Sequence, residues 1–308
     1  MATFSRADAG AWRVLYQRYL TAKPEIVAGM TLTPPSLSNE FAGKDAVDSY
    51  RFQFQSARTW VDETFQSPEM RYFFASCGLH GALGPDDALG ANFAWLFAAA
   101  VQDVGVSMVK GGMHHVSCAL AAELAGPWRR DPYHLERKGC RCGEGQGDST
   151  SVRLDDGETI ALDGVIASNV DPRHLALDLL GEALVGEGIA GKIRRYDWGQ
   201  SFFGIYLALD SPVPYRAGSD ADQAGYVHIG GPSLDDLAET IAHARAGLLP
   251  KRPMIGAINE ALIDPSRAPP GKGLMKFVVH FVPYRVTGDA GASALPIGTT
   301  SRSLTPTR

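Results

Sequence analysis

A glycine pattern at residues 186–191, Gly-Glu-Gly-Ile-Ala-Gly, matches the loop with which many enzymes bind dinucleotides. Asp210 lies near the distance downstream at which such enzymes hold a ribose hydroxyl. The loop functions between a buried strand and a helix, because the strand presents the glycines and the helix N-terminus faces the pyrophosphate. Here a helix-like segment, residues 175–184, precedes the glycines. We therefore predict that the match is coincidental, and a nicotinamide-dependent dehydrogenase would need a strand before Gly186.

A second candidate site is a strand, turn and helix predicted over residues 165–180. The short apolar strand leads into Ser168 and Asn169, and Asp171, followed by proline, begins the helix. In open α/β sheets, ligands collect beyond the carboxyl ends of strands, where Ser168 and Asn169 could hydrogen-bond them. Asp171 is a natural helix cap, however, and its carboxylate would repel a phosphate. The sequence leaves a structural cap and a ligand-binding edge equally open.

A double glycine, Gly111-Gly112, precedes Met113 and a helix predicted over residues 114–125. Without side chains, the two glycines would let the backbone approach a ligand closely. A simple tight turn explains them as well and is the simpler hypothesis.

The other chemistry-bearing side chains form no complete site in the sequence. His114 and His115 are adjacent, so they do not share a helix face, and no third ligand lies at a useful spacing for a metal. Four further histidines are scattered, and most of them are expected to be structural: His80, His174, His228 and His280. Six aromatic residues could line an apolar tunnel, although helical spacing favours an ordinary core: Tyr72, Phe73, Phe74, Phe93, Trp95 and Phe97.

The hydrophobic pattern predicts an α/β fold. Helices are expected in the first third: one from Ser5 that Pro24 and residues 31–38 end, one over 46–65, one from Ser67-Pro68, and a buried one over 88–101 that residues 84–86 open. Asp156-Gly157 between two β-like runs predicts a hairpin. Further strands are expected at 202–209, 226–229, 255–262 and 274–282, with a helix from Ser233.

The composition indicates a soluble globular protein. Of 308 residues, 45% are hydrophobic and 20% charged, which excludes a disordered chain. The 29 basic and 34 acidic residues form no basic stripe, so nucleic acid is not an expected partner. Four cysteines are too few for a disulfide scaffold, and we expect a reducing, cytoplasmic location without a signal sequence or a membrane span.

Several segments resemble phytoene desaturase-like FAD-dependent oxidoreductases. Residues 109–121, with Val-Lys-Gly-Gly-Met-His-His-Val followed by Ala-Leu-Ala, resemble one conserved stretch of that family. Residues 152–172 resemble another, with a hairpin, a buried strand and a Ser-Asn-Val-Asp-Pro corner in the family's order. Later pieces resemble the branch containing the pyridine nucleotide-disulfide oxidoreductase domain 2 proteins: residues 193–196, 264–272 and 281–284. The resemblance covers most of residues 5–285.

This resemblance implies FAD as cofactor and desaturase or dehydrogenase chemistry on an apolar, isoprenoid-like substrate. It places Gly111, Gly112 and Met113 towards the flavin and the substrate cavity. It places Ser168, Asn169 and Asp171 beside the FAD.

The resemblance also implies a partial FAD/NAD(P)-binding-type fold with a substrate domain of mixed sheet plus helices. Residues 1–108 would be the helical part of the substrate domain, 109–180 a remnant of the discontinuous FAD domain, 181–286 the substrate-domain sheet and helix, and 287–308 a disordered tail. The family's initial strand and glycine loop, its final glycine-rich segment, and the strand expected within 126–150 are missing from the pattern. We therefore expect an incomplete chain, with a non-catalytic binding or interaction module as the alternative. Its partner would be an apolar small molecule. The surface on which the missing part of the FAD domain would pack should be an exposed apolar patch, which would allow peripheral membrane contact and self-association.

Overall fold

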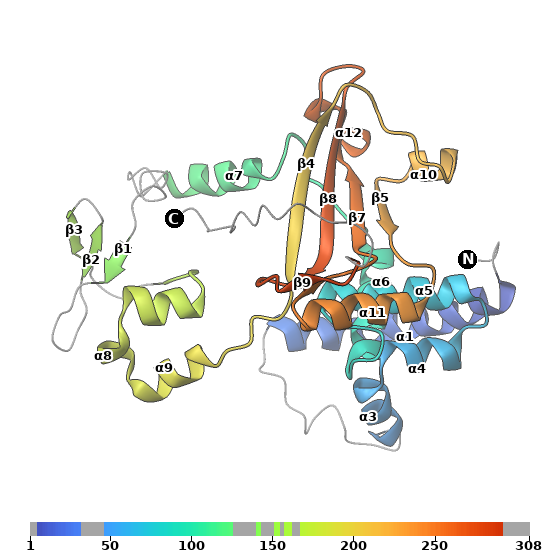
Figure 1. Cartoon of the computed structure of the whole chain (residues 1–308), viewed down its shortest axis with the longest axis horizontal. Coiled ribbons are helices and arrows are strands. Elements are labelled where there is room, and N and C mark those ends of the chain that lie inside the picture. Colours follow the sequence, from blue (N-terminus) through green and yellow to red (C-terminus); the bar gives the residue numbers. More distant parts are fainter. Residues whose placement is uncertain are drawn as a thin grey trace. The chain divides into compact units, whose positions relative to one another are not determined.

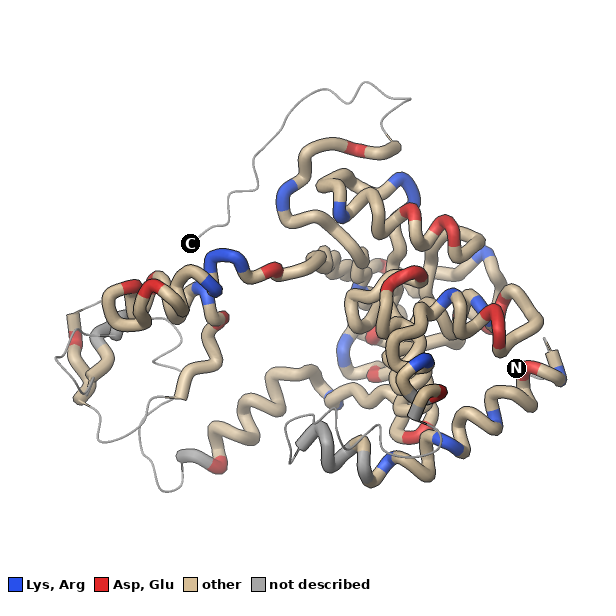
Figure 2. Tube along the Cα trace, turned by 90° about the horizontal axis from the view of Figure 1, so that it is seen from below, with Lys and Arg blue, Asp and Glu red and all other residues tan. Residues whose placement is uncertain are grey.

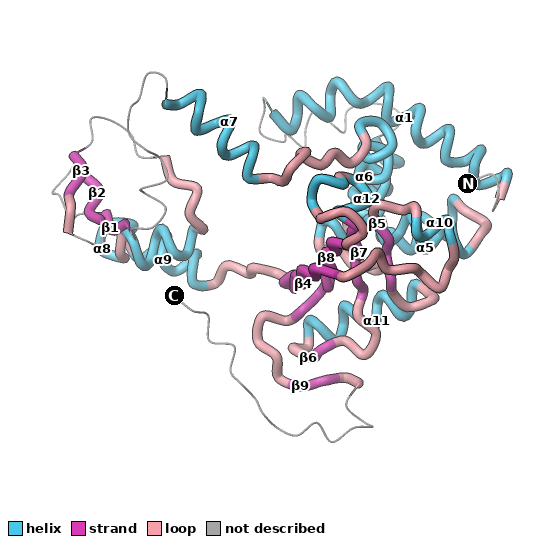
Figure 3. The backbone as a smooth tube through the Cα atoms, turned by 90° about the horizontal axis from the view of Figure 1, so that it is seen from above, coloured by secondary structure: helices cyan, strands magenta, loops and turns pink. Residues whose placement is uncertain are grey.

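The structure is a computed structural model that describes residues 5–31, 46–125, 140–142, 151–154, 157–161 and 167–291. The chain divides into two compact units. We call residues 1–111 with 200–308 the sheet unit, and residues 112–199 the hairpin unit. Figure 1 labels the elements, and Figure 3 separates helices from strands by colour.

The sheet unit begins with a helical layer. Its elements are α1 (Arg6–Thr31), α3 (Ala46–Phe54), α4 (Ala57–Thr64), α5 (Pro68–Ser76), the 3₁₀ helix η1 (Cys77–Gly81) and α6 (Gly90–Val104). Ser67 caps α5 as predicted, since its hydroxyl accepts the amide of Met70. The predicted helix over 46–65 is instead two helices, because Ser56 caps the start of α4. Pro24 does not end α1, which accommodates it and continues to Thr31.

A turn held by ion pairs precedes α6. The helix predicted to open at residues 84–86 begins only at Gly90, because the two aspartates of this turn bind arginines instead. Asp86 accepts a hydrogen bond from Arg58 at 2.5 Å, and Asp87 accepts one from Arg245 at 2.5 Å.

Charged residues of both signs are interspersed along the described trace (Figure 2).

Aromatic side chains fill the core between these helices. The largest members of this core are Trp12, Tyr19, Trp60, Phe65, Phe74 and Trp95. The expectation that Phe74 and Trp95 belong to the core is confirmed. Phe73 is half exposed, because consecutive residues of an α-helix point in different directions and Phe74 takes the buried side of α5.

A four-stranded antiparallel sheet with the order β4-β8-β7-β5 forms the rest of the sheet unit. The strands are β4 (Ser201–Leu209), β5 (Tyr226–Ile229), β7 (Met254–Asn259) and β8 (Gly273–Val282). The remaining elements are α10 (Ser219–Asp222), α11 (Leu234–Arg245), α12 (Glu260–Ile263) and the 3₁₀ helix η4 (Pro265–Arg267). The strand predicted over 255–262 ends at Asn259, because that side chain caps α12 by accepting the amide of Leu262. Helices combined with this sheet confirm the predicted α/β class.

The chain after Thr287 begins with a short strand. β9 (Gly288–Asp289) pairs in parallel with β6 (Leu248–Leu249). The predicted onset of disorder at residue 287 is therefore wrong, since Thr287 already donates its amide to Gly247 and the backbone pairing continues from there. Residues 292–308 lie outside the described residues.

The hairpin unit contains α7 (His114–Ala125), β1 (Cys140–Cys142), β2 (Ser151–Leu154), β3 (Thr159–Ala161), the π-helix η3 (His174–Leu179), α8 (Glu182–Val185) and α9 (Glu187–Arg194). The predicted hairpin is confirmed, because β2 and β3 pair antiparallel across a turn in which Gly157 has φ +88°. The boundary predicted at residue 180 falls inside this unit, which extends to Gly199. The strand predicted at 165–167 lies mostly outside the described residues. No helix in the described part of the chain has the length and apolarity needed to cross a bilayer.

Candidate functional site

The double-glycine turn is held by a clamp of two side chains within the sheet unit. Asp264, which is buried, accepts the amide of Gly111 at 2.6 Å. Arg267 donates to the carbonyl of Gly111 at 3.0 Å and to Glu260 at 3.0 Å. Asp264 also accepts the amide and the hydroxyl of Ser266, at 3.1 and 2.7 Å. The hydrogen bond from Gly111 is the main reason why the pKa of Asp264 lies below its usual value.

This clamp decides how the glycines could serve a ligand. Gly111 and Gly112 have φ +81° and +113°, a backbone conformation that favours glycine. The clamp engages the N–H and one lone pair of the carbonyl oxygen of Gly111, so a flavin could contact this residue at its Cα or at the other lone pair. The sequence contains both halves of the clamp among the segments that resemble the family, but no local pattern joins Gly111 to Asp264.

Replacing Asp264 with alanine is expected to release the Gly111 amide to solvent. Because this amide has one carboxylate acceptor, its hydrogen exchange should speed up by about tenfold or more. Exchange measured residue by residue on the full chain tests this. Ser266→Ala is the matched control and should leave Gly111 protected; equal protection of Gly111 in the Asp264→Ala chain would contradict the clamp.

The corner at residues 168–171 lies in the hairpin unit and is partly structural. Asp171 accepts the amides of Arg173 and His174 at 3.1 and 3.0 Å, so it is the helix cap, one of the two alternatives that the sequence leaves open. The hydroxyl of Ser168 accepts the amide of Val170 at 3.3 Å. Asn169 is exposed, and its side chain has no partner among the described residues. Asn169 is therefore the group at this corner that remains available to a ligand.

The six residues assigned from the family resemblance are divided between the two units. Gly111 belongs to the sheet unit, and Gly112, Met113, Ser168, Asn169 and Asp171 belong to the hairpin unit. Whether they face one cofactor stays a prediction.

The glycine pattern at residues 186–191 is not a dinucleotide loop. α8 ends at Val185, directly before the first glycine, and α9 begins at Glu187. A helix where the fingerprint requires a strand confirms the prediction of a coincidental match.

Three of the histidines that are scattered in the sequence lie together in the sheet unit. The ring centroids of His80 and His228 are 5.6 Å apart, and each lies 5.9 Å from that of His280. β5 pairs His228 with Gly256, and β8 pairs Val278 with the same glycine. His280 lies two residues from Val278 and so shares its face of the sheet with His228. The sequence places these residues on separate elements; strand register brings His228 beside His280, and η1 adds His80.

The surroundings of this histidine cluster are aromatic. His80 stacks on Phe97 at 4.2 Å, and Phe202 lies 5.1 Å from His280. The phenol of Tyr226 is 2.9 Å from Nε2 of His228, over Gly256, where a Cβ would lie 2.4 Å from that oxygen.

Burial keeps the cluster uncharged at neutral pH. It lowers the pKa of His80, and it lowers the pKa of His228 and of His280 to about 4, with the neighbouring histidines adding to the effect. No group of three His, Cys, Asp or Glu side chains in the described ranges is placed to share a metal ion.

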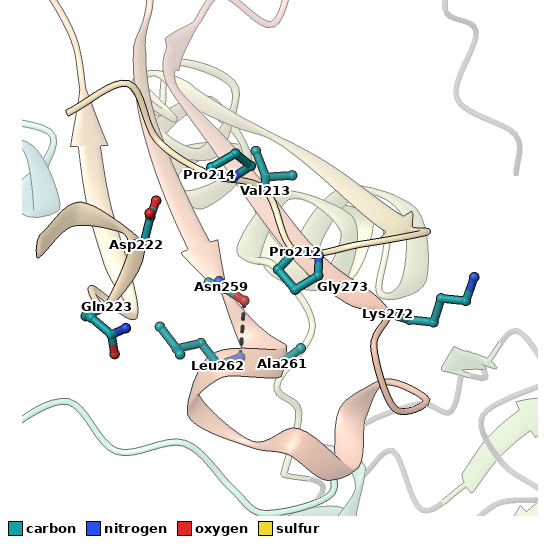
Figure 4. A pocket seen from close by; sticks show the side chains of 10 residues that line it. All are labelled: Pro212, Val213, Pro214, Asp222, Gln223, Asn259, Ala261, Leu262, Lys272 and Gly273. Atoms are coloured by element: carbon teal, nitrogen blue, oxygen red, sulfur yellow. Dashed lines mark hydrogen bonds between the residues drawn. The ribbon is translucent and has the colours of Figure 1, made fainter. Parts of the chain in front are cut away.

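A cleft of about 500 Å³ lies beside α10, α12 and the start of β8 (Figure 4). Three of its four polar side chains, all except Gln223, have structural partners. Asp222 accepts the amide of Tyr215 at 2.6 Å, Asn259 caps α12, and Lys272 pairs with Asp210 at 2.9 Å. This cleft therefore offers less unused chemistry than the histidine cluster.

Comparison with known proteins gives three findings. The family model described as "Flavin containing amine oxidoreductase" matches residues 1–289. The mouse (Mus musculus) pyridine nucleotide-disulfide oxidoreductase domain-containing protein 2 is 24% identical over 280 residues, which are 87% of this chain and 46% of that protein. The chain thus spans about half the length of this curated relative. The crystal structure of the PF1083 protein from Pyrococcus furiosus aligns with a TM-score of 0.47 and 16% identity, over 83% of this chain and 56% of that one.

Proposed function

The chain belongs to the flavin containing amine oxidoreductase family, and on that premise we propose that it takes part in FAD-dependent oxidation of an apolar substrate. The observation that carries the proposal is the family match over residues 1–289, which implies FAD as the cofactor. We further propose a desaturase or dehydrogenase reaction on an isoprenoid-like molecule, which the resemblance of residues 109–121 and 152–172 supports.

The described residues fit the flavin ring of FAD better than its pyrophosphate. Asn169 offers an unpartnered donor and acceptor, which suits the polar edge of a flavin. Asp171 would repel a pyrophosphate, and the glycine pattern at residues 186–191 follows a helix, where a loop that cradles a pyrophosphate follows a strand. We propose that Ser168, Asn169 and the turn at Gly112 and Met113 contact the flavin. When bound, FAD would supply the redox chemistry, and these residues would hold the flavin in position and exclude water from it.

One face of the sheet supports an apolar substrate. Phe202 and Tyr206 lie four residues apart on β4, and both side chains lie on the face of the sheet that carries His280. Their side chains are 54% and 67% exposed, respectively. Gly204 lies between them, the ring of Tyr206 lies 3.7 Å from the position that a Cβ of Gly204 would take, and the ammonium of Lys276 lies 5.3 Å from the centre of that ring. Exposed aromatic surface of this kind is typical of sites that bind apolar molecules.

The direct test is a visible absorbance spectrum of the full chain after incubation with FAD and removal of the free cofactor. A retained flavin spectrum is expected, and Asn169→Ala should weaken FAD affinity by about tenfold through loss of its hydrogen bonds. Asn92→Ala, the same change on α6, is the matched control and should bind FAD as the unaltered chain does. A colourless chain that is folded by circular dichroism would overturn the proposal and support the alternative of a non-catalytic binding module.

A further inference from the structure

The histidine cluster has hydrogen-bonding capacity that the protein does not use. His280 is 3% exposed, and neither of its ring nitrogens has a hydrogen-bond partner in the described structure. A neutral imidazole carries one N–H donor and one acceptor nitrogen, so both functions of His280 are unmatched. Buried polar groups without partners are rare in folded proteins and mark sites with a further role.

The chemistry of the cluster selects the kind of group that would match it. The rings are neutral at neutral pH, and the charges that act on the pKa of His280 are those of His80 and His228 themselves. Because the described residues surround the cluster with aromatic rings and no charged group among them shifts the pKa of His280, an ion would be poorly stabilised there. A hydroxyl both donates and accepts, so it can serve an imidazole N–H and an imidazole nitrogen at once.

The cluster is also placed where an apolar molecule would reach it. His80 and His228 are half-buried, so the cluster extends from His280 to the surface. Phe202 is half exposed on the edge strand β4, and its ring centroid lies 5.1 Å from that of His280, so a side chain at the surface borders this histidine. An apolar chain lying along Phe202 and Tyr206 would end at these imidazoles.

We propose that His80, His228 and His280 form a subsite that binds the hydroxyl end of an otherwise apolar substrate. The inference rests on the proposed function, since it specifies the substrate of the same sheet face. It needs no bound FAD for its test.

The experiment compares the binding of geraniol, an isoprenoid alcohol, with that of its analogue carrying hydrogen in place of the hydroxyl. Equilibrium dialysis against the full chain should show geraniol bound about tenfold more tightly, because two hydrogen bonds are made only to the alcohol. Geraniol should also shift the imidazole nitrogen resonances of the three histidines. In His280→Phe the preference for the alcohol should disappear, and in His80→Phe it should fall.

His174→Phe makes the same change at an exposed position and should keep the full preference. Equal binding of the two ligands, no binding of geraniol to the folded chain, or an unchanged preference in both His280→Phe and His80→Phe would overturn the subsite. So would thermal stabilisation by zinc that is lost in His280→Phe, which would identify a metal site instead. A chain that binds geraniol through His280 but stays colourless with FAD would keep the subsite and remove the proposed redox function.

Discussion

The Phe74→Ala variant is expected to unfold with a free energy about 4 kcal/mol lower than that of the unaltered chain. Phe74 is fully buried, its ring stacks on Phe65 with centroids 4.5 Å apart, and it lies 4.4 Å from the ring of Trp12. Removing the ring loses the favourable free energy of its transfer out of water and also its dispersion contacts. A close-packed aromatic core cannot collapse to fill the space.

Urea unfolding followed by tryptophan fluorescence measures this change, because Trp12, Trp60 and Trp95 lie in the same core. Phe73→Ala removes the same atoms from the neighbouring, half-exposed position and should change the free energy by less than about 1 kcal/mol. Equal losses in the two variants would show that the core is not packed as described.

Asp8→Ala is expected to lower the free energy of unfolding by about 3 kcal/mol. The buried carboxylate of Asp8 accepts the amides of Gln66 and Ser67 at 2.8 and 2.9 Å, and so joins α1 to the turn between α4 and α5. Alanine would leave these two amides without an acceptor, which destabilises a fold more than the mean value of a hydrogen bond suggests.

The same carboxylate predicts a dependence of stability on pH. Burial alone would raise the pKa of Asp8, but the amides of Gln66 and Ser67, the hydroxyl of Ser5 and the charge of Arg71 together hold the pKa below its usual value. A carboxyl whose pKa is lowered by folding stabilises the fold fully above the pKa it has in the unfolded chain. That contribution is lost as the pH falls through the folded pKa.

Unfolding free energies measured between neutral pH and about pH 3 should therefore fall less steeply for Asp8→Asn than for the unaltered chain. Asn keeps the shape of the side chain but does not titrate. Arg13→Gln, on the same helix and outside these contacts, is the control and should keep the steep decline. Parallel curves for Asp8→Asn and the unaltered chain would contradict the role given to Asp8.

Local sequence determined most of the elements. Serine caps before helices, Asp-Gly between two β-like runs and continuous apolar strands act within a few residues, so Ser67, Gly157 and β5 lie where the pattern predicts them. Two predicted elements have wrong boundaries, because a side chain within each of them caps a helix. Ser56 divides a predicted helix because it caps α4, and Asn259 ends a predicted strand because it caps α12.

The sequence by itself also determined that residues 186–191 are no dinucleotide loop, since helical periodicity before the glycines contradicts the required strand. The resemblance of its segments predicts a FAD-dependent oxidoreductase, which the match to the flavin containing amine oxidoreductase family over residues 1–289 confirms, while the phytoene desaturase-like relationship stays a prediction.

Only the tertiary structure decided which distant side chains meet. Asp264 binds Gly111 across 153 positions of the chain, and the pairing of β5, β7 and β8 places His228 beside His280. The physical reason is register: a shift of one residue in any of these strands would turn its side chains to the opposite face, and no short pattern in the sequence specifies that alignment.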